Sequence, residues 1–150
     1  MNEKENIERE LAVQIVGEYC SAVLAAHECW DIADDLLHAQ SASEVLQALT
    51  SALRYIRNVI AEKGDLIAYY LAQLSATREA KNAGVLDIEF TETKKGELRV
   101  TPKSLRRLLD WSFSYIRKLL KEQGTDAQLL ALELAVCMFS KYPKYWEVRK

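Results

Sequence analysis

Apolar positions along most of the chain recur every three or four residues, the spacing that places side chains on one face of an α-helix. The first such stretch spans 3–26, and its wide apolar face predicts burial along most of its length. A short second helix follows from Trp30. Its polar face carries Asp31, Asp34 and Asp35. The apolar positions are Ile7, Leu11, Val13, Ile15, Val16, Cys20, Val23 and Leu24 in the first helix and Trp30, Ala33, Leu36 and Leu37 in the second.

Two further helices are predicted between Ser41 and Gly84. Ser41 and Glu44 form a capping box, in which each side chain bonds a backbone N–H group at a helix start. The helix that they open runs to Gly64, and Asp65 caps a fourth helix that ends at Gly84. Their inner faces carry Val45, Leu49, Leu53, Ile56 and Ile60, then Ile67, Tyr70, Leu71 and Leu74.

The hydrophobic period then changes to two, which is typical of a β-strand. The alternation stops at Lys94-Lys95-Gly96 and resumes behind it, so we expect one β-hairpin near 85–101 with Gly96 in the left-handed conformation. A lone hairpin is only marginally stable in water, so its apolar face should pack on a helix or on another subunit. The alternating apolar residues are Leu86, Ile88, Phe90, Leu98 and Val100.

Two helices complete the chain. Thr101 is an N-cap followed by Pro102 at the first helical position, and the helix that they open runs to about Gln123. Thr125 and Gln128 predict a second capping box and a sixth helix that stops near Pro143. The inner positions are Leu105, Leu108, Ser112, Ile116 and Leu119 in the fifth helix and Leu129, Leu132, Val136 and Phe139 in the sixth.

These patterns together predict a mainly α fold, a bundle of about six helices with one inserted β-hairpin. The 150 residues, 49% of them hydrophobic, suit a single domain over 1–150. The charged start of the chain has no apolar signal region, and no apolar run is long enough to cross a membrane. Three cysteines without CxxC spacing favour buried, reduced thiols. We therefore expect a cytoplasmic protein.

Positive charge is concentrated on the hairpin and the fifth helix. Between Lys94 and Lys121 the chain has nine basic residues and only two acidic ones, Glu97 and Asp110, although its net charge is −2. A merely solvated face mixes charges of both signs, so this bias predicts a surface for the phosphate backbone of RNA or DNA. The residues expected to contact phosphates are Lys94, Lys95, Arg99, Lys103, Arg107, Arg117, Lys118 and Lys121.

The two halves of the chain differ in charge. Residues 1–75 carry a net charge of −7, and residues 76–150 carry +5. An acidic half of one copy could therefore meet the basic half of the next, which favours head-to-tail stacks. Because such contacts rely on surface charges, we expect only weak self-association. A protein-binding adaptor or a self-assembling structural protein is thus an alternative to nucleic-acid binding.

Two further sets of residues resemble metal sites. Asp31, Asp34, Asp35 and His38 share a helical face, and such a face with Glu28 nearby is typical of helical nucleotide hydrolases that use Mg²⁺ or Mn²⁺. Such enzymes need a second acidic helix, which the region after Ser41 does not supply. Zinc would need a spacing that the other set lacks. That set is Cys20, His27, Cys29 and His38. We expect no metal, no cofactor and no catalysis.

The last residues combine aromatic and basic side chains and predict either base stacking or a tail docked on the core. They include Tyr142, Tyr145 and Trp146 among Lys141, Lys144, Arg149 and Lys150.

The middle third of the chain resembles a known family. The resemblance rests on three features: Trp30-Asp31-Ile32-Ala33-Asp34, the helix that Ser41 and Glu44 cap and that continues into Ala52-Leu53-Arg54-Tyr55-Ile56-Arg57, and the hairpin. On these residues the chain is similar to the small subunit of archaeal type I CRISPR effector (Cascade) complexes, a helical protein that can carry a β-rich insertion. The resemblance implies a non-enzymatic subunit of a ribonucleoprotein complex for antiviral defence, beside guide RNA, displaced DNA and other subunits. It assigns no individual binding residue.

Overall fold

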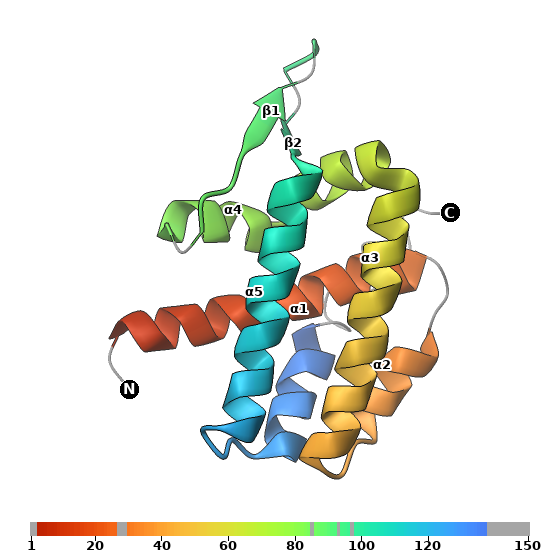
Figure 1. The fold of residues 1–150 in the computed structure, drawn as a ribbon, viewed down its shortest axis with the longest axis vertical. Coiled ribbons are helices and arrows are strands. Elements are labelled where there is room, and N and C mark those ends of the chain that lie inside the picture. Colours follow the sequence, from red (N-terminus) through yellow and green to blue (C-terminus); the bar gives the residue numbers. More distant parts are fainter. Residues whose placement is uncertain (1–2, 27–29, 85, 93, 97, 138–150) are drawn as a thin grey trace.

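The computed structural model describes residues 3–26, 30–84, 86–92, 94–96 and 98–137. The fold is mainly α with one antiparallel hairpin, as the sequence predicts (Figure 1). A further helical segment, which has no label in the figure, covers 127–137. The labelled elements are α1 (Glu3–Ala26), α2 (Trp30–Leu37), α3 (Ala42–Ala72), α4 (Ser75–Ala83), β1 (Phe90–Glu92), β2 (Leu98–Val100) and α5 (Pro102–Lys121).

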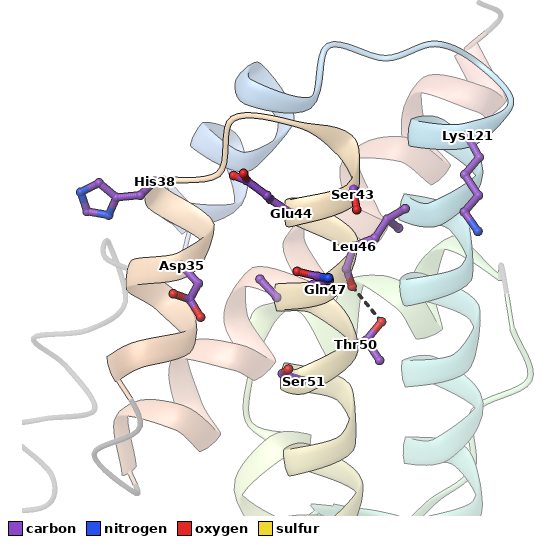
Figure 2. A pocket seen from close by; sticks show the side chains of 10 residues that line it. Asp35, His38, Ser43, Glu44, Leu46, Gln47, Thr50, Ser51 and Lys121 are labelled. Atoms are coloured by element: carbon purple, nitrogen blue, oxygen red, sulfur yellow. Dashed lines mark hydrogen bonds between the residues drawn. The ribbon is translucent and has the colours of Figure 1, made fainter.

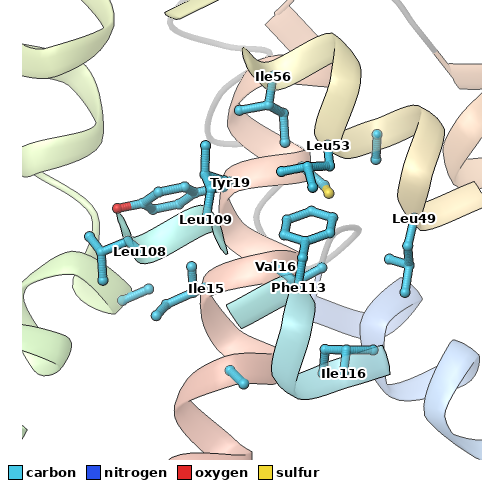
Figure 3. Packing of buried hydrophobic residues seen from close by; sticks show 14 of the residues in the cluster. Ile15, Val16, Tyr19, Leu49, Leu53, Ile56, Leu108, Leu109, Phe113 and Ile116 are labelled. Carbon is cyan, nitrogen blue, oxygen red and sulfur yellow. The ribbon is translucent and has the colours of Figure 1, made fainter. Parts of the chain in front are cut away.

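The core forms where α1, α3 and α5 pack on one another, with α2 against α3 and α4 against α1. Figure 3 shows Phe113 of α5 close to Val16 of α1 and Leu53 of α3. All five apolar positions predicted for the third helix and all five inner positions predicted for the fifth are buried, which confirms both faces. One position on the first helix was predicted wrongly, because Ile7 is 46% exposed.

The segment predicted as one helix after Gly64 is divided in two. The backbone breaks at Lys63 (φ −126°, ψ 38°), as expected next to a glycine, but it breaks again at Leu74, which is extended and buried. The hydroxyl of Thr77 donates to the carbonyl oxygen of Leu71 over 2.7 Å, and the Tyr19 hydroxyl bonds Thr77 in turn. This buried network gives the Leu71 carbonyl oxygen at the second break a side-chain partner, which local sequence does not predict.

The hairpin is confirmed, with shorter strands than the alternation predicts. Phe90 pairs with Val100, and Gly96 takes a positive φ of 79° in the turn. Val100 is fully buried and β2 packs against α3, so the hairpin rests on a helix at its base. The Nζ atom of Lys81 in α4 lies 4.4 Å from the centre of the Phe90 ring. From this base the hairpin projects beyond the helices (Figure 1).

The orientation predicted for the last helix is wrong. Asp126, and not Thr125, caps it, because the Asp126 side chain accepts from the Leu129 N–H group over 3.1 Å. Gln128 instead donates to the side chain of Gln40. The buried residues are Leu130, Ala131, Leu134 and Ala135. The predicted inner residues Leu129, Leu132 and Val136 are 55%, 52% and 59% exposed. Phe139 and Pro143 lie outside the described residues.

Two of the cysteines belong to the described residues. Cys20 is completely buried, and burial raises the pKa of its thiol to about 12. It is a reduced core residue, as predicted, whereas Cys137 is only partly buried, which the prediction of buried thiols did not anticipate. Burial likewise raises the pKa of the Tyr19 phenol next to Cys20 above its ordinary value. Across the described ranges no helix has the length and apolar character needed to cross a membrane.

Candidate nucleic-acid interface

The hairpin and α5 are joined by hydrogen bonds around Ser104. The Thr101 side chain caps α5 by accepting from the Ser104 N–H group over 3.2 Å, and the Thr101 hydroxyl donates to Ser104 Oγ over 3.0 Å. Ser104 Oγ also accepts from the Glu89 N–H group at 2.9 Å, and the Thr101 N–H group donates to the Glu89 carbonyl oxygen at 3.1 Å. The hairpin is therefore fixed relative to the helix that carries most of the basic residues.

Replacing Ser104 with alanine should loosen this junction. Ser104 is 2% exposed, so its loss leaves the Glu89 N–H group without its partner. We expect Ser104→Ala to lower the free energy of unfolding by about 1–2 kcal/mol, measured by urea denaturation. Hydrogen exchange should also accelerate at the Glu89 amide. Ser114→Ala is the control, since Ser114 is an exposed serine on the same helix. Equal effects of the two variants would contradict the proposed junction.

The cations predicted on α5 lie on its solvent side. Lys103, Arg107, Lys118 and Lys121 are exposed, and Arg117 is half-buried. At 100° per residue the four exposed side chains fall within one narrow stripe along the helix. Around its C-terminal part, Arg117, Lys118 and Lys121 line a surface hollow of 380 Å³ together with Ser114 and Glu122. The structure thus brings five of the eight predicted residues onto one surface.

The three predicted cations of the hairpin differ in their exposure to solvent. Lys94 and Lys95 are exposed in the projecting turn. Arg99 in β2 was predicted on an outward face, but it is half-buried, and its Nε atom has no hydrogen-bond partner among the residues that the structure describes. Since β2 packs on α3, the strand position encloses part of the Arg99 side chain.

The single acid in the basic stripe has a partner that the sequence did not indicate. Asp110 forms an ion pair with Arg57 of α3, and about half of each side chain is exposed (51% for Arg57 and 55% for Asp110). The pair offsets the negative charge of Asp110, and Arg54, one turn away on α3, is also exposed. The positive surface therefore extends from α5 onto α3. A contact across 53 positions of sequence leaves no local signal.

Two aromatic residues border the basic stripe and were also missed. Trp111 and Tyr115 are half-buried, and their ring centres lie 5.6 Å apart with planes tilted by 45°. Trp111 lies four residues after Arg107, and Tyr115 three before Lys118, so rings and cations share one side of the helix. The sequence contains this pair at positions i and i+4, but a search for apolar periodicity assigns such aromatic residues to the core.

The placement of these cations is unfavourable for the helix itself. A helix N-terminus carries partial positive charge, which favours acidic residues there. The first turn of α5 has none, and Lys103, Arg106 and Arg107 lie in its first two turns. Solvation alone does not require cations at this end, whereas a bound anion would be attracted by both the side chains and the helix terminus.

The acidic face of α2 borders a second hollow. The hollow has a volume of 990 Å³ and is lined by Asp35 from α2, by His38 directly after α2, and by Ser43, Glu44 and Gln47 from α3 (Figure 2). The complete lining is Asp35, His38, Ser43, Glu44, Leu46, Gln47, Ala48, Thr50, Ser51 and Lys121.

Three of the polar residues around this hollow, His38, Glu44 and Thr50, form hydrogen bonds within the fold. Ser41 Oγ accepts from the Glu44 N–H group over 3.3 Å, which confirms one half of the capping box. The Glu44 carboxylate accepts from the Gln40 N–H group over 2.7 Å, one residue before the predicted position. His38 Nδ1 lies 3.6 Å from an Asp34 carboxylate oxygen. In the described part of the chain no three His, Cys, Asp or Glu side chains form a group that could hold a metal ion. The hydrolase alternative therefore gains no support from this face.

Several residues considered from the sequence lie outside the described ranges. These are Glu97, His27, Glu28 and Cys29, and the aromatic and basic residues of 138–150. The expectation that Cys20, His27, Cys29 and His38 hold no zinc, and the two interpretations of the aromatic end, therefore stay predictions.

No protein-family model matches this chain, and comparisons with curated proteins and with solved structures give no match either. The similarity to CRISPR small subunits therefore stays a prediction, and the geometry of the basic surface carries the functional argument.

Proposed function

We propose that the chain binds the phosphate backbone of RNA or DNA through the basic surface of α5, the hairpin turn and the neighbouring arginines of α3. The observation that carries the proposal is the exposed stripe of Lys103, Arg107, Lys118 and Lys121 on α5. The one acidic residue within α5, Asp110, is paired with Arg57, and Glu122 follows the end of the helix. Phosphate contacts of this kind supply affinity without reading sequence.

The aromatic pair beside the stripe adds a second kind of contact. Bases of a single strand can stack on Trp111 or Tyr115 while the neighbouring cations hold its phosphates. A duplex keeps its bases stacked on one another and cannot use this contact. We therefore propose a preference for single strands over duplexes.

In this proposal the protein is a non-enzymatic, cytoplasmic subunit of a larger ribonucleoprotein complex, as its resemblance to CRISPR effector small subunits implies. It positions nucleic acid by contact and has other subunits as partners. Self-association through opposite charges is weak, because exposed ion pairs add little affinity. A protein-binding adaptor is the second candidate, and the exposed apolar residues of 127–137 favour it.

Salt dependence of binding tests the proposal. Fluorescence anisotropy of labelled single-stranded RNA, single-stranded DNA and duplex DNA gives the dissociation constant of each at several salt concentrations. We expect a log–log slope of about −3 on single strands, from four or five phosphate contacts at about −0.7 each. Single strands should bind more tightly than the duplex. A salt-independent affinity, or no binding at about 50 mM salt, would refute the proposal.

A further inference from the structure

The last helical segment leaves an apolar face exposed. Four large hydrophobic residues in the described part of the chain are strongly exposed, and three of them, Leu129, Leu132 and Val136, lie on this segment. Their spacing of three and four places them on one side, opposite the buried Leu130 and Leu134. Isolated exposed leucines are common on protein surfaces, but a contiguous stripe indicates an interaction site.

A hollow with a buried carboxylate adjoins this stripe. It has a volume of 380 Å³ and lies between α1 and the segment 127–137. Glu133 lies four residues after Leu129, about 40° around the helix from it at 100° per residue, so the hollow borders the stripe on that side. The full lining is Arg9, Glu10, Val13, Gln14, Glu18, Glu133 and Cys137.

Glu18 gives the hollow a preference for cations. Only 2% of Glu18 is exposed, and its Oε2 atom has no hydrogen-bond partner within the described ranges. The neighbouring Arg9 is committed to Glu133 through two hydrogen bonds of 3.1 and 3.0 Å. A buried carboxylate oxygen without a partner is costly, and an incoming ammonium or guanidinium group would remove that cost.

The charge around the stripe disfavours a symmetric contact between two copies. Arg9 and Glu133 neutralise each other, which leaves Glu10 and Glu18 as net negative charge beside the stripe. In an antiparallel two-fold contact centred on Leu132, the carboxylates of the two copies would lie on the same side of the contact, and like charges repel. The same charges attract a basic partner.

We propose that this face docks a basic amphipathic helix of another protein subunit. Apolar side chains of that helix cover Leu129, Leu132 and Val136, and one of its lysines or arginines reaches into the hollow to pair with Glu18. A ridge of residues spaced by three and four on a helix surface is the usual complement of a second helix. This docking surface includes no residue of the basic α5 stripe, so the inference does not depend on nucleic-acid binding.

Selection of peptides on the full-length chain tests the proposal. A display library of helical peptides of about 15 residues is selected on the native protein, with counter-selection on the variant Leu132→Ser/Val136→Ser. Enriched peptides should share apolar residues at helical spacing and an excess of lysine or arginine. Their affinity should fall at least about tenfold on Glu18→Gln, which removes the charge but keeps the shape. Ile7→Ser is the matched control and should leave binding unchanged, because Ile7 is an exposed apolar residue outside the hollow.

Two results would overturn the proposal. One is enrichment of peptides that lack basic residues or bind Glu18→Gln as tightly as the native protein. The other is occupation of the face by this chain itself, tested with the photo-crosslinking substitution Leu132→p-benzoylphenylalanine. In the purified protein alone this side chain should form no cross-link to a second copy or to residues 138–150, and it should cross-link the selected peptide.

Discussion

Reversing Arg107 and Lys118 to glutamate is expected to weaken single-strand binding at least about 100-fold at low salt. Each reversal removes a cation that displaces counterions from the nucleic acid, and it places a negative charge against the phosphates. Both side chains are exposed on the same side of α5, so the variant should fold normally. Anisotropy titrations give the loss of affinity, and circular dichroism confirms that the helices remain.

The control changes net charge equally at other positions. Lys4→Glu/Arg78→Glu reverses two exposed cations on α1 and α4, outside the proposed surface. We expect it to weaken binding by less than about threefold, through the long-range field alone. Equal losses in both double variants would show that net charge, and not the α5 stripe, determines binding. Unfolding of the α5 variant alone would contradict its solvent-facing position.

The elements that local chemistry specifies were predicted well from the sequence. Thr101 followed by Pro102 defines a helix start regardless of tertiary context, and α5 begins there. Gly84 and Gly96 take the left-handed conformations that their positions require. The buried face of α5 followed from periodicity because its alternative face is charged, which leaves one orientation for packing. The exposure of Lys103, Arg107, Lys118 and Lys121 follows from the same face.

The errors arose where two arrangements fit the sequence equally well. The last helix has apolar residues on two faces, one through Leu129 and Leu132 and the other through Leu130 and Leu134. Only the packing against α1 decides which face is buried. Partners far apart in sequence were likewise invisible, as in the Arg57–Asp110 ion pair and the network from Tyr19 through Thr77. For this reason the candidate surface was predicted without its arginines on α3.

Charge and packing divide the molecule into two surfaces with different partners. The first surface is positive and consists of the α5 stripe and the basic hairpin turn. The second is the hollow beside 127–137, which has a net negative charge and adjoins the exposed residues Leu129, Leu132 and Val136. A subunit that held nucleic acid on the first surface and a basic protein helix on the second would link the two within one assembly. The second surface is formed by α1 and 127–137 together, so its shape depends on how these two helices cross.

That crossing depends on Gly17. A Cβ atom at this position would lie 2.3 Å from the Cβ of Cys137, far inside van der Waals contact. Glycine within a helix costs about 1 kcal/mol relative to alanine, so its presence in α1 is explained by this close approach. The small residue lets 127–137 pack directly on the α1 backbone, next to Glu18.

Gly17→Ala should therefore destabilise the protein although alanine favours helices. Overpacking costs about 1–3 kcal/mol, and a clash with a Cβ atom falls at the upper end because a rotamer change cannot relieve it. After the propensity gain we expect a net loss of about 2 kcal/mol, or about 6 °C in Tm by calorimetry. Cys137→Gly should restore much of this loss in the double variant, because the nearest remaining atom would be the Cys137 Cα at 3.5 Å. Cys137→Ala retains the Cβ and should not rescue. A double-mutant cycle measures the coupling, and additive effects of Gly17→Ala and Cys137→Gly would contradict the proposed contact.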